Sequence, residues 1–278
     1  MRAEPIFIPL DEGAASLLNR LHAAGHAAYA VGGCVRDSLL GLVPHDWDLC
    51  TSATPAEVLA LFGEEHCIPT GLQHGTVTIK SHGNLYETTT FRTEGAYSDG
   101  RHPDAVHFVP DVKEDLARRD FTINAMAYNE TEGLIDIFGG LKDIEAKLIR
   151  CVGNPEERFG EDALRIMRAI RFSAQLGYEI HEDTEAAIRK LAPTLQKISA
   201  ERIQVELTKL LVSPHPDTLR EAYDMGVTKV ILPEFDAMME TPQKHKHHKY
   251  NVGEHTLHAL MEILSLIHIS EPTRLRRI

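Results

Sequence analysis

The chain has 278 residues, of which 43% are hydrophobic, and a formal net charge of −12 at pH 7. This length allows one large domain or two to three small ones, and the apolar content can support a sizeable core. The negative charge argues against a protein that coats polyanions without specificity, although it leaves room for a local basic groove.

The cysteines and the hydropathy pattern indicate the compartment. Cys34, Cys50, Cys67 and Cys151 are scattered, without a C-x-x-C pair. Together with the lack of a signal peptide, this favours free thiols in a reducing compartment. No apolar run reaches the roughly 18 residues that a membrane span requires. The sequence therefore predicts a soluble, cytoplasmic protein without membrane association.

The first 150 residues read as strands alternating with helices, which predicts a mixed α/β domain. Residues 92–105 are polar and rich in turn formers, which predicts a mobile loop. In chain order we expect a helix at 11–24, a strand at 27–31, a short helix at 34–40, a strand at 46–50, a helix at 54–62, a hairpin of 76–80 and 85–89, a strand at 106–109, a mostly helical stretch at 112–128 and a strand at 134–138.

From residue 154 onward the apolar spacing is helical. Helices are expected at 161–177, 181–193, 198–212 and about 216–225. We therefore place a domain boundary near residue 150 and a softer one near Pro214.

The segment from Gly32 to Asp37 and the carboxylates of Asp46 and Asp48 form the central chemical motif. Glycines let a backbone approach a phosphate closely. In an extended strand Asp46 and Asp48 point to the same face, and two such carboxylates repel unless a cation lies between them. Mg²⁺ prefers oxygen ligands and usually takes one or two carboxylates together with phosphate oxygens. Each feature alone is common in turns and edge strands, but their order and closeness predict chemistry on a nucleoside triphosphate.

Glu87, in the second strand of the predicted hairpin, is the candidate third acid. It would serve as a metal ligand or base if that strand lies next to Asp46 and Asp48. The alternative is an exposed strand residue without a catalytic role.

A second candidate site lies more than a hundred residues downstream. Asp162, Arg165 and Arg168 are three apart, so on a helix they share one face, and Arg171 continues the line. A carboxylate accepts hydrogen bonds and a guanidinium donates them, which matches the paired edges of cytosine and adenine. Guanine and uracil present the reverse order and would leave charged groups unpaired. The alternative is a solvated charged helix face.

Six segments in order resemble the signatures of class II tRNA nucleotidyltransferases, the CCA-adding enzymes, to which bacterial poly(A) polymerases are close relatives. They are GGCVRD, HDWDL, YETTTFRTEG with DGRHP, RRDFTINAMAY, GEDALRIMRAIRF and SAERIQVEL, and together they cover about residues 25–212. The resemblance implies a polymerase-β-type nucleotidyltransferase head (1–150), a helical neck (151–213) and the start of a helical body or HD-like module (214–263).

The resemblance also implies roles for single residues. Asp46 and Asp48 would bind Mg²⁺, and Glu87 would assist them as the third catalytic acid. The loop with Asp99, Gly100 and Arg101 is similar to the family's flexible loop, which helps the switch to A addition. The candidate nucleotide-binding residues are Gly32, Gly33, Arg36, Arg119, Asp120, Asn124, Asp162, Arg165, Arg168 and Arg171.

The C-terminal part of the chain resembles two other things. The segment YNVGEHTLHAL is similar to the opening of an HD-type phosphohydrolase module, in which His255 matches the first metal ligand. The remaining ligands of that module are absent, so no phosphohydrolase site is expected. Residues 264–278 resemble the in-frame translation of a sequencing-library adapter, which predicts a non-native tail on a truncated chain.

The expected activity is Mg²⁺-dependent transfer of CMP and AMP from CTP and ATP to the 3′ end of tRNA, without a nucleic-acid template. A poly(A) polymerase or an enzyme that adds only A is the alternative with the same chemistry. A non-catalytic tRNA-binding protein is the alternative from another class. The long segment at 92–105 disfavours a CC-only enzyme, because such enzymes of this family lack it.

Overall fold

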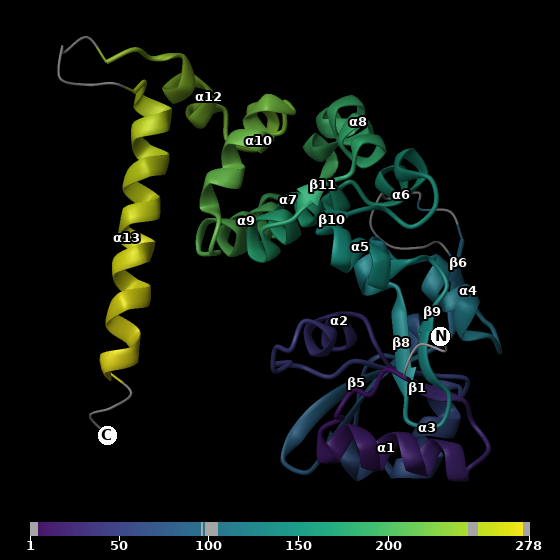
Figure 1. Cartoon of the computed structure of the whole chain (residues 1–278). Helices are drawn as coiled ribbons and strands as arrows, with labels where there is room; N and C mark the ends of the chain where they lie inside the picture. The colour runs from purple at the N-terminus through teal and green to yellow at the C-terminus, as the bar shows by residue number, and fades with distance from the viewer. Residues whose placement is uncertain (1–4, 96, 98–104, 244–249, 275–278) are drawn as a thin grey trace. The chain divides into compact units, whose positions relative to one another are not determined.

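The computed structural model describes residues 5–95, 97, 105–243 and 250–274 (Figure 1). The chain divides into two compact units. The first comprises Met1–Ala146 and Cys151–Gly153, and the second comprises Lys147–Arg150 and Asn154–Ile278. Within the described residues, no helix combines the length and the apolar character that crossing a membrane requires.

The first unit is built of strands and short helices. Its elements are α1 (Glu12–Ala23), β1 (Ala28–Val31), α2 (Gly33–Leu39), β2 (Leu49–Thr51), α3 (Pro55–Phe62), β3 (Cys67–Gly71), β4 (Thr76–Ser81), β5 (Asn84–Thr90), β6 (Arg92–Glu94), β7 (Val106–Phe108), α4 (Val112–Ala117), β8 (Met126–Asn129), β9 (Gly133–Asp136) and α5 (Gly140–Ala146). The predicted mixed α/β fold of this part of the chain is confirmed.

Seven of these strands form one mixed sheet in the order β3-β4-β5-β2-β1-β8-β9. Strands β2 and β5 run parallel, and the other neighbours are antiparallel. Strands β4 and β5 meet at His82 and Gly83, which both have positive φ. Such a two-residue turn matches the right-handed twist of the strands. The predicted hairpin at 76–80 and 85–89 is confirmed.

Different helices cover the two faces of the sheet. The hydroxyl of Tyr86 in β5 donates to Asp11, the N-cap of α1, at 2.6 Å. The next side chain, Glu87, points to the opposite face because side chains alternate along a strand. On that opposite face, Tyr29 and Cys50 pack in one core with Leu116 of α4. Glu87 therefore shares the face on which α4 packs.

The strand predicted at 46–50 is shorter in the structure, because β2 begins only at Leu49. Leu49 pairs with Ala30 of β1, which is the last antiparallel pair of these two strands. The Val31 amide then donates to the Asp48 carbonyl, and β1 ends in the glycine turn. The chain before Leu49 therefore has no strand to pair with on that side. The alternation nevertheless persists, since Trp47 is buried while the aspartates on either side are exposed.

The prediction of a mostly helical stretch at 112–128 is wrong beyond Ala117. A 3-10 turn covers Thr122–Asn124, and β8 follows from Met126. The sequence NAMAY favours a helix by composition, but β8 is fully buried and pairs with both β1 and β9. Tertiary pairing on both sides overrides a weak local propensity.

The predicted loop at 92–105 also contains regular structure. Residues Arg92–Glu94 form β6, which pairs antiparallel with β7. Asp99, Gly100 and Arg101, which the sequence assigns to a flexible loop, lie outside the described residues.

The second unit is mainly helical, as predicted. Its elements are β10 (Leu148–Ile149), α6 (Pro155–Glu161), α7 (Leu164–Leu176), β11 (Glu179–Ile180), α8 (Glu182–Leu191), α9 (Ala200–Leu211), α10 (Leu219–Asp224), α11 (Thr228–Ile231), α12 (Pro233–Glu240) and α13 (Val252–Arg274). The expected helices at 181–193 and 198–212 are confirmed. The finer domain boundaries near residues 151, 214 and 264 stay predictions.

The helix predicted at 161–177 is divided in two around Asp162. Asp162 has extended backbone angles (φ −142°, ψ 107°), and its side chain accepts a bond from the Leu164 amide at 2.9 Å. Short acidic side chains bond to nearby backbone amides and so favour helix ends over helix interiors. Asp162 therefore does not share a helix with Arg165, contrary to the prediction.

The start of α3 provides a test of local stability. The Thr54 side chain and Glu57 form a reciprocal capping box, whereas Ser199 at the start of α9 makes no capping bond. Loss of a capping side chain costs about 1 kcal/mol. We expect Thr54→Ala to weaken amide hydrogen-exchange protection in the first turn of α3, and Ser199→Ala to leave that of α9 unchanged. Equal effects of the two substitutions would contradict this account.

Candidate active site

Three carboxylates line one cavity in the first unit. Asp46 and Asp48 stand just before β2, and the parallel register that places Leu49 opposite Thr88 brings Glu87 beside Asp48. A cavity of about 530 Å³ is lined by Asp46, Trp47, Asp48, Ile68, Thr78, Leu85 and Glu87. The structure therefore places the three acids that the sequence singles out around one cavity, two just before β2 and one on β5.

The carboxylates disturb one another electrostatically. Although the Asp48 side chain remains open to the cavity, the surrounding protein withdraws water from it, which raises the pKa of Asp48. The charges of Glu87 and Asp46 raise that pKa further, and Arg119 opposes the shift. A raised carboxyl pKa means that burial and nearby negative charge disfavour the ionised form.

A glycine turn and an arginine lie beside these acids. Gly32, between β1 and α2, has φ +81°, a backbone conformation that residues with a side chain rarely adopt. A Cβ on Gly32 would stand 3.2 Å from Nη1 of Arg119, so a larger residue would also crowd the guanidinium. Gly33 opens α2 directly after the turn. The positive φ and the close approach of the Arg119 guanidinium are typical of a backbone turn that binds an anion next to a cation.

Arg36 and Asn124 meet across the same corner. Arg36 is largely buried, and its Nη1 donates to the Asn124 side-chain oxygen at 2.7 Å. Its Nε and Nη2 donate to Asp37 at 2.9 and 2.7 Å. The structure thus brings together two predicted nucleotide-binding residues that are 88 positions apart in the sequence.

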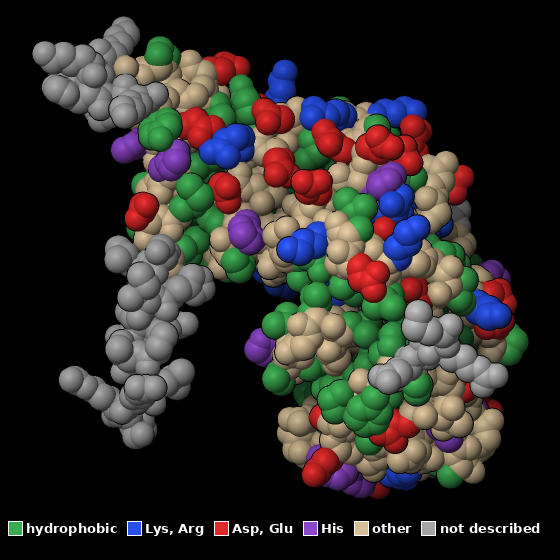
Figure 2. All heavy atoms as spheres, viewed as in Figure 1, with side chains coloured by type: hydrophobic (Ala, Val, Ile, Leu, Met, Phe, Trp, Pro, Cys, Tyr) green, Lys and Arg blue, Asp and Glu red, His purple; other side chains and the backbone are tan. Residues whose placement is uncertain are grey.

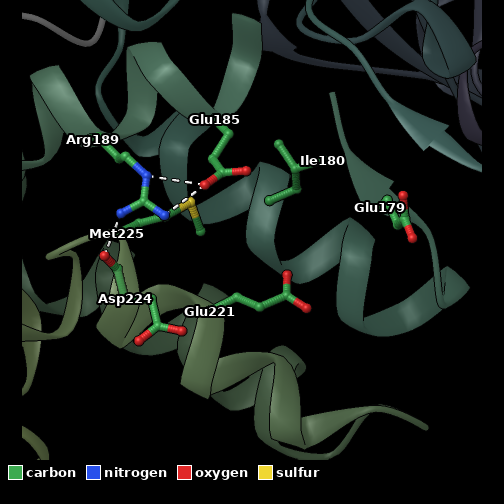
Figure 3. Close-up of a pocket in the computed structure, with 7 residues that line it drawn as sticks. All are labelled: Glu179, Ile180, Glu185, Arg189, Glu221, Asp224 and Met225. Carbon is green, nitrogen blue, oxygen red and sulfur yellow. Dashed lines mark hydrogen bonds and ion pairs between the residues drawn. The ribbon is translucent and has the colours of Figure 1, made fainter. Parts of the chain in front are cut away.

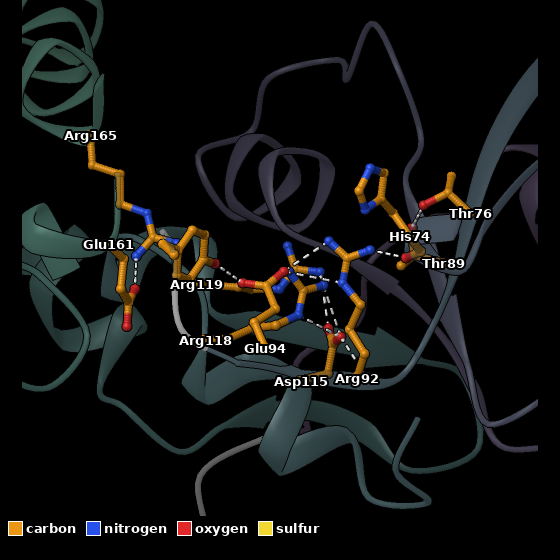
Figure 4. A network of polar contacts seen from close by, with 11 residues as sticks. His74, Thr76, Thr89, Arg92, Glu94, Asp115, Arg118, Arg119, Glu161 and Arg165 are labelled. Carbon is orange, nitrogen blue, oxygen red and sulfur yellow. Dashed lines mark hydrogen bonds and ion pairs between the residues drawn. The ribbon is translucent and has the colours of Figure 1, made fainter. Parts of the chain in front are cut away.

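Arg119 is oriented by a buried acid that the sequence does not single out. Asp115 is fully buried, and its Oδ2 accepts from Arg119 Nη2 at 3.3 Å. Its Oδ1 accepts from Arg118 and from the backbone amide of Arg92, as Figure 4 shows for the side chains. Within the described residues, Arg119 Nε is buried without a hydrogen-bond partner. The spacing of four residues between Asp115 and Arg119 is the sequence signal for this pair, once the end of α4 is known.

The hydrogen bonds of Asp120 stabilise the backbone around it. It is buried, its side chain accepts from the Phe121 amide at 2.8 Å, and its carbonyl accepts from the Val152 amide at 3.0 Å. These bonds fix the turn that follows Arg119.

In the helical unit, the residues predicted to select the base have protein partners. Asp162 accepts from Arg202 of α9 at 2.7 Å. Arg165 donates to Glu161 at 2.5 Å, a pair also drawn in Figure 4. Both are half-buried. Asp162 thus lies in the junction between α6 and α7, three residues before Arg165.

Arg168 and Arg171 differ in burial. Arg168 is half-buried and lies over the Phe172 ring at 5.3 Å. Arg171 is buried, pairs with Glu206 of α9 and donates to Gln175 at 2.7 Å. These contacts give Arg171 a packing role between α7 and α9, which the predicted nucleotide role did not anticipate.

A different cavity, of about 330 Å³, lies in the helical unit between β11, α8 and α10 (Figure 3). Its lining includes Glu179, Glu185, Glu221 and Asp224, with Arg189 bonded to Glu185. Burial, reinforced by the neighbouring acids, raises the pKa of Glu221. An acid-lined cavity repels phosphates, so it is not the candidate site for a nucleotide.

The surface charge agrees with a local rather than a general polyanion site. On the face that Figure 2 shows, acidic and basic side chains are interspersed over the helical unit. Among the residues described there, this face therefore offers no continuous basic surface to a polyanion.

The donor set of the cavity fits a hard divalent cation. Aspartate and glutamate oxygens are the ligands that Mg²⁺ prefers, and it commonly uses one or two of them while keeping waters or phosphate oxygens. In the part of the chain that the structure describes, no three His, Cys, Asp or Glu side chains are close enough to hold an ion by themselves. Burial, and then the neighbouring carboxylates, raise the pKa of Asp48, and a bound cation would offset both effects.

His255, the predicted counterpart of a phosphohydrolase ligand, lies exposed near the start of α13. The histidines at 245, 247 and 248 lie outside the described residues.

Two family profiles match the chain. The profile described as the poly A polymerase head domain matches residues 28–150, and one described as a probable RNA and SrmB-binding site of polymerase A matches residues 177–239.

The curated relatives that match the chain are named as CCA-adding enzymes. The CCA-adding enzyme of Lactiplantibacillus plantarum is 55% identical over 205 residues, which are 74% of this chain and 50% of that enzyme. The CCA-adding enzyme of Latilactobacillus sakei is 54% identical over 222 residues, covering 80% and 55%. The chain thus spans about half the length of the curated relatives it matches.

Solved structures give the same picture. The Bacillus stearothermophilus CCA-adding enzyme in complex with CTP matches with a TM-score of 0.71 and 45% identity, covering 78% of this chain and 52% of that one. The Thermotoga maritima enzyme complexed with tRNA matches with a TM-score of 0.67 and 28% identity, covering 81% and 54%.

The electrostatics of Asp48 predict a response to pH and to metal. Because its folded-state pKa is raised, protonation stabilises the metal-free protein, and that contribution is lost as pH rises through the raised pKa. We expect Asp48→Asn to raise the metal-free melting temperature at neutral pH by about 2 °C. The same substitution should remove most of the stabilisation by added Mg²⁺. Differential scanning fluorimetry checks both, with the exposed Glu130→Gln as the control; a lower metal-free melting temperature for Asp48→Asn would contradict the account.

Proposed function

Because the chain belongs to the family of CCA-adding tRNA nucleotidyltransferases and poly(A) polymerases, we propose that it transfers CMP and AMP from CTP and ATP to the 3′ end of tRNA. The observation that carries the proposal is the cavity where Asp46, Asp48 and Glu87 converge beside the glycine turn and Arg119. The relatives named for this activity, with structures in complex with CTP and with tRNA, support it.

The head residues divide the work of the reaction. Gly32 and Gly33 let the backbone approach the triphosphate, and Arg119 supplies positive charge next to them. Arg36, held by Asn124 and Asp37, adds a second guanidinium to this corner. Developing charge on the pyrophosphate is stabilised by groups that are already in place and need no reorganisation.

The carboxylates act on the other side of the reacting phosphate. Asp46 and Asp48, with help from Glu87, would hold Mg²⁺, which when bound lowers the pKa of the attacking hydroxyl and neutralises the leaving pyrophosphate. The negative charge of the three acids keeps the site ready for a cation and rejects a lone phosphate.

Selection of the base is assigned to Asp162 and Arg165 at the start of α7. One accepts and the other donates, as the paired edges of cytosine and adenine require. In the protein alone, Arg202 and Glu161 occupy these groups, so a nucleotide exchanges one set of charge-assisted bonds for another.

The alternative is an enzyme of the same chemistry that adds only A, or a poly(A) polymerase. A non-catalytic tRNA-binding protein is disfavoured by the convergence of the three acids. We further propose that the protein acts in the cytoplasm, which the four free, buried cysteines support.

Replacement of a metal-binding acid tests the reaction. We expect Asp46→Ala to reduce transfer of radiolabelled nucleotide to tRNA by at least about a thousandfold, since the metal supplies several kcal/mol of transition-state stabilisation. The Asp46 side chain is exposed, so the melting curve should stay close to that of the wild type. The control is Glu130→Ala, and transfer by Asp46→Ala at near wild-type rate would refute the metal role.

Replacement of the base-selecting pair tests the second half of the proposal. In Asp162→Ala or Arg165→Ala, preference for CTP and ATP over GTP and UTP should fall by about ten- to a hundredfold, because an unpaired charged group no longer penalises the wrong base. Competition between nucleotides measures this ratio directly. Arg189→Ala removes another Arg–Glu pair of the same unit and serves as control. Unchanged selectivity in both variants would remove the template assignment.

A further inference from the structure

Three arginines and two acids form one largely buried cluster in the head, on β6 and at the end of α4. Its ion pairs join Arg92, Arg118 and Arg119 to Glu94 and Asp115 (Figure 4). Buried charges are costly unless each is paired. Because the cluster has one more guanidinium than carboxylates, it carries a surplus positive charge, and the pairing determines where that charge lies.

Glu94 bonds to two of the three arginines. Arg92 and Glu94 are two apart on β6, so their side chains share a face, and Arg92 Nε and Nη2 donate to Glu94 Oε1 at 3.1 and 2.8 Å. Arg118 Nη1 donates to the same oxygen at 3.0 Å. Burial opposes ionisation of Glu94, but the charge of Arg118, the Tyr97 hydroxyl and Arg92 together lower the pKa of this carboxyl. Glu94 is therefore a carboxylate that offsets the charge of its neighbours.

The two oxygens of Asp115 differ in their bonding. Oδ1 accepts from Arg118 Nε and Nη2 at 3.0 and 2.9 Å and from the Arg92 amide at 3.2 Å. Oδ2 accepts from Arg119 Nη2 in a longer bond of 3.3 Å. Among the described residues, the buried Nε of Arg119 has no hydrogen-bond partner. Arg119 is therefore the guanidinium with the weakest pairing in the cluster.

The bonds of Glu94 leave the second oxygen of Asp115 to Arg119. Without the charge of Glu94, three guanidinium groups would share Asp115 as the one carboxylate of the cluster. Opposite charges attract strongly where water is excluded, so Arg92 and Arg118 would then compete with Arg119 for that carboxylate. Arg119 would lose the bond that directs it toward the turn at Gly32.

We infer that Glu94 is a positioning residue for triphosphate binding, because it neutralises Arg92 and Arg118 and so keeps the surplus positive charge of the cluster at Arg119. This inference rests on the proposed nucleotidyl transfer and adds to it a residue that acts through Asp115 and Arg119. Since the effect of Glu94 is one of charge balance, a variant that restores the balance without Glu94 should restore binding.

Binding of inorganic tripolyphosphate reads this site without catalysis. Isothermal titration calorimetry on the full chain in Mg²⁺ measures the Kd. We expect Glu94→Gln to raise the Kd about tenfold, the size of one hydrogen bond between charged groups. In an Arg119→Ala background the same substitution should change the Kd less than about twofold, because effects that pass through one shared partner do not add. The control Glu185→Gln removes an acid from the Arg189 pair of the helical unit and should bind as the wild type does.

A charge-balanced variant separates positioning from packing. Arg92→Gln combined with Glu94→Gln removes the acid together with one of the arginines it neutralises, so the surplus charge is again a single one. Binding should return to within about threefold of the wild type. If Glu94 served packing alone, the double variant would bind at least as weakly as Glu94→Gln. The same variant decides the question if Glu94→Gln does not fold, because it leaves no additional arginine without its acid.

Three results would each overturn the inference: an unchanged Kd in Glu94→Gln, an equal loss with and without Arg119, or a double variant that binds more than about threefold more weakly than the wild type. Each of them, in a chain that transfers nucleotide to tRNA, leaves the proposed function standing. The expected binding pattern in a chain that transfers no nucleotide would instead overturn the proposed function and leave the role of Glu94 standing.

Discussion

Repulsion among Asp46, Asp48 and Glu87 is the constraint around which the head is built. The parallel pairing of β2 with β5 brings Glu87 beside Asp48, and the bond between the Val31 amide and the Asp48 carbonyl fixes the chain just before β2. Burial, followed by the charges of Glu87 and Asp46, raises the pKa of Asp48, so the ionised form of this carboxyl is disfavoured in the folded protein. Such an arrangement lowers the stability of the metal-free protein, and a bound cation would offset that cost.

The arginines of the site are held in place by hydrogen bonds within the protein. Arg119 would be mobile at the end of a short helix, but the buried Asp115 holds it against the glycine turn. Arg36 is held in the same way by Asn124 and Asp37. Each guanidinium therefore keeps a fixed direction through bonds inside the protein, so little ordering remains when a triphosphate binds. In our account the head determines the reaction, and Asp162 and Arg165 in the helical unit determine which nucleotide is used.

Local sequence signals predict the parts of the structure that depend on local physics. The capping residue Thr54, the turn at His82–Gly83 and the apolar spacing of α8 and α9 each specify their element without help from distant residues. The order of the strands and the position of Glu87 beside Asp48 follow from pairing across the sheet, which spacing alone does not reveal. For the same reason the sequence suggested a helix where β8 lies, because only its two partner strands make Met126 and Ala127 extended.

In the candidate site, too, the residues predicted correctly are those with a local sequence signal. Asp46 and Asp48 are found from a two-residue spacing, and their exposure on either side of the buried Trp47 agrees with it. The sequence placed Asp162 inside a helix because its spacing from Arg165 fits a helix face. In the structure its carboxylate instead accepts from the Leu164 amide at the junction of two helices. Asp115 and Glu94 were missed since acids in a helix and in a strand are ordinary until the fold shows which arginines they face.

The most direct test of the account is the product ladder on a tRNA that ends before CCA, with Mg²⁺ and each nucleoside triphosphate supplied singly and then together. We expect CTP alone to add a short run of C and ATP to be added after it. GTP and UTP should not be used, and the ladder should stop at three nucleotides with CTP and ATP together. Addition of A alone in a long run, or incorporation of all four nucleotides, would contradict the assignment of C and A selection to this chain.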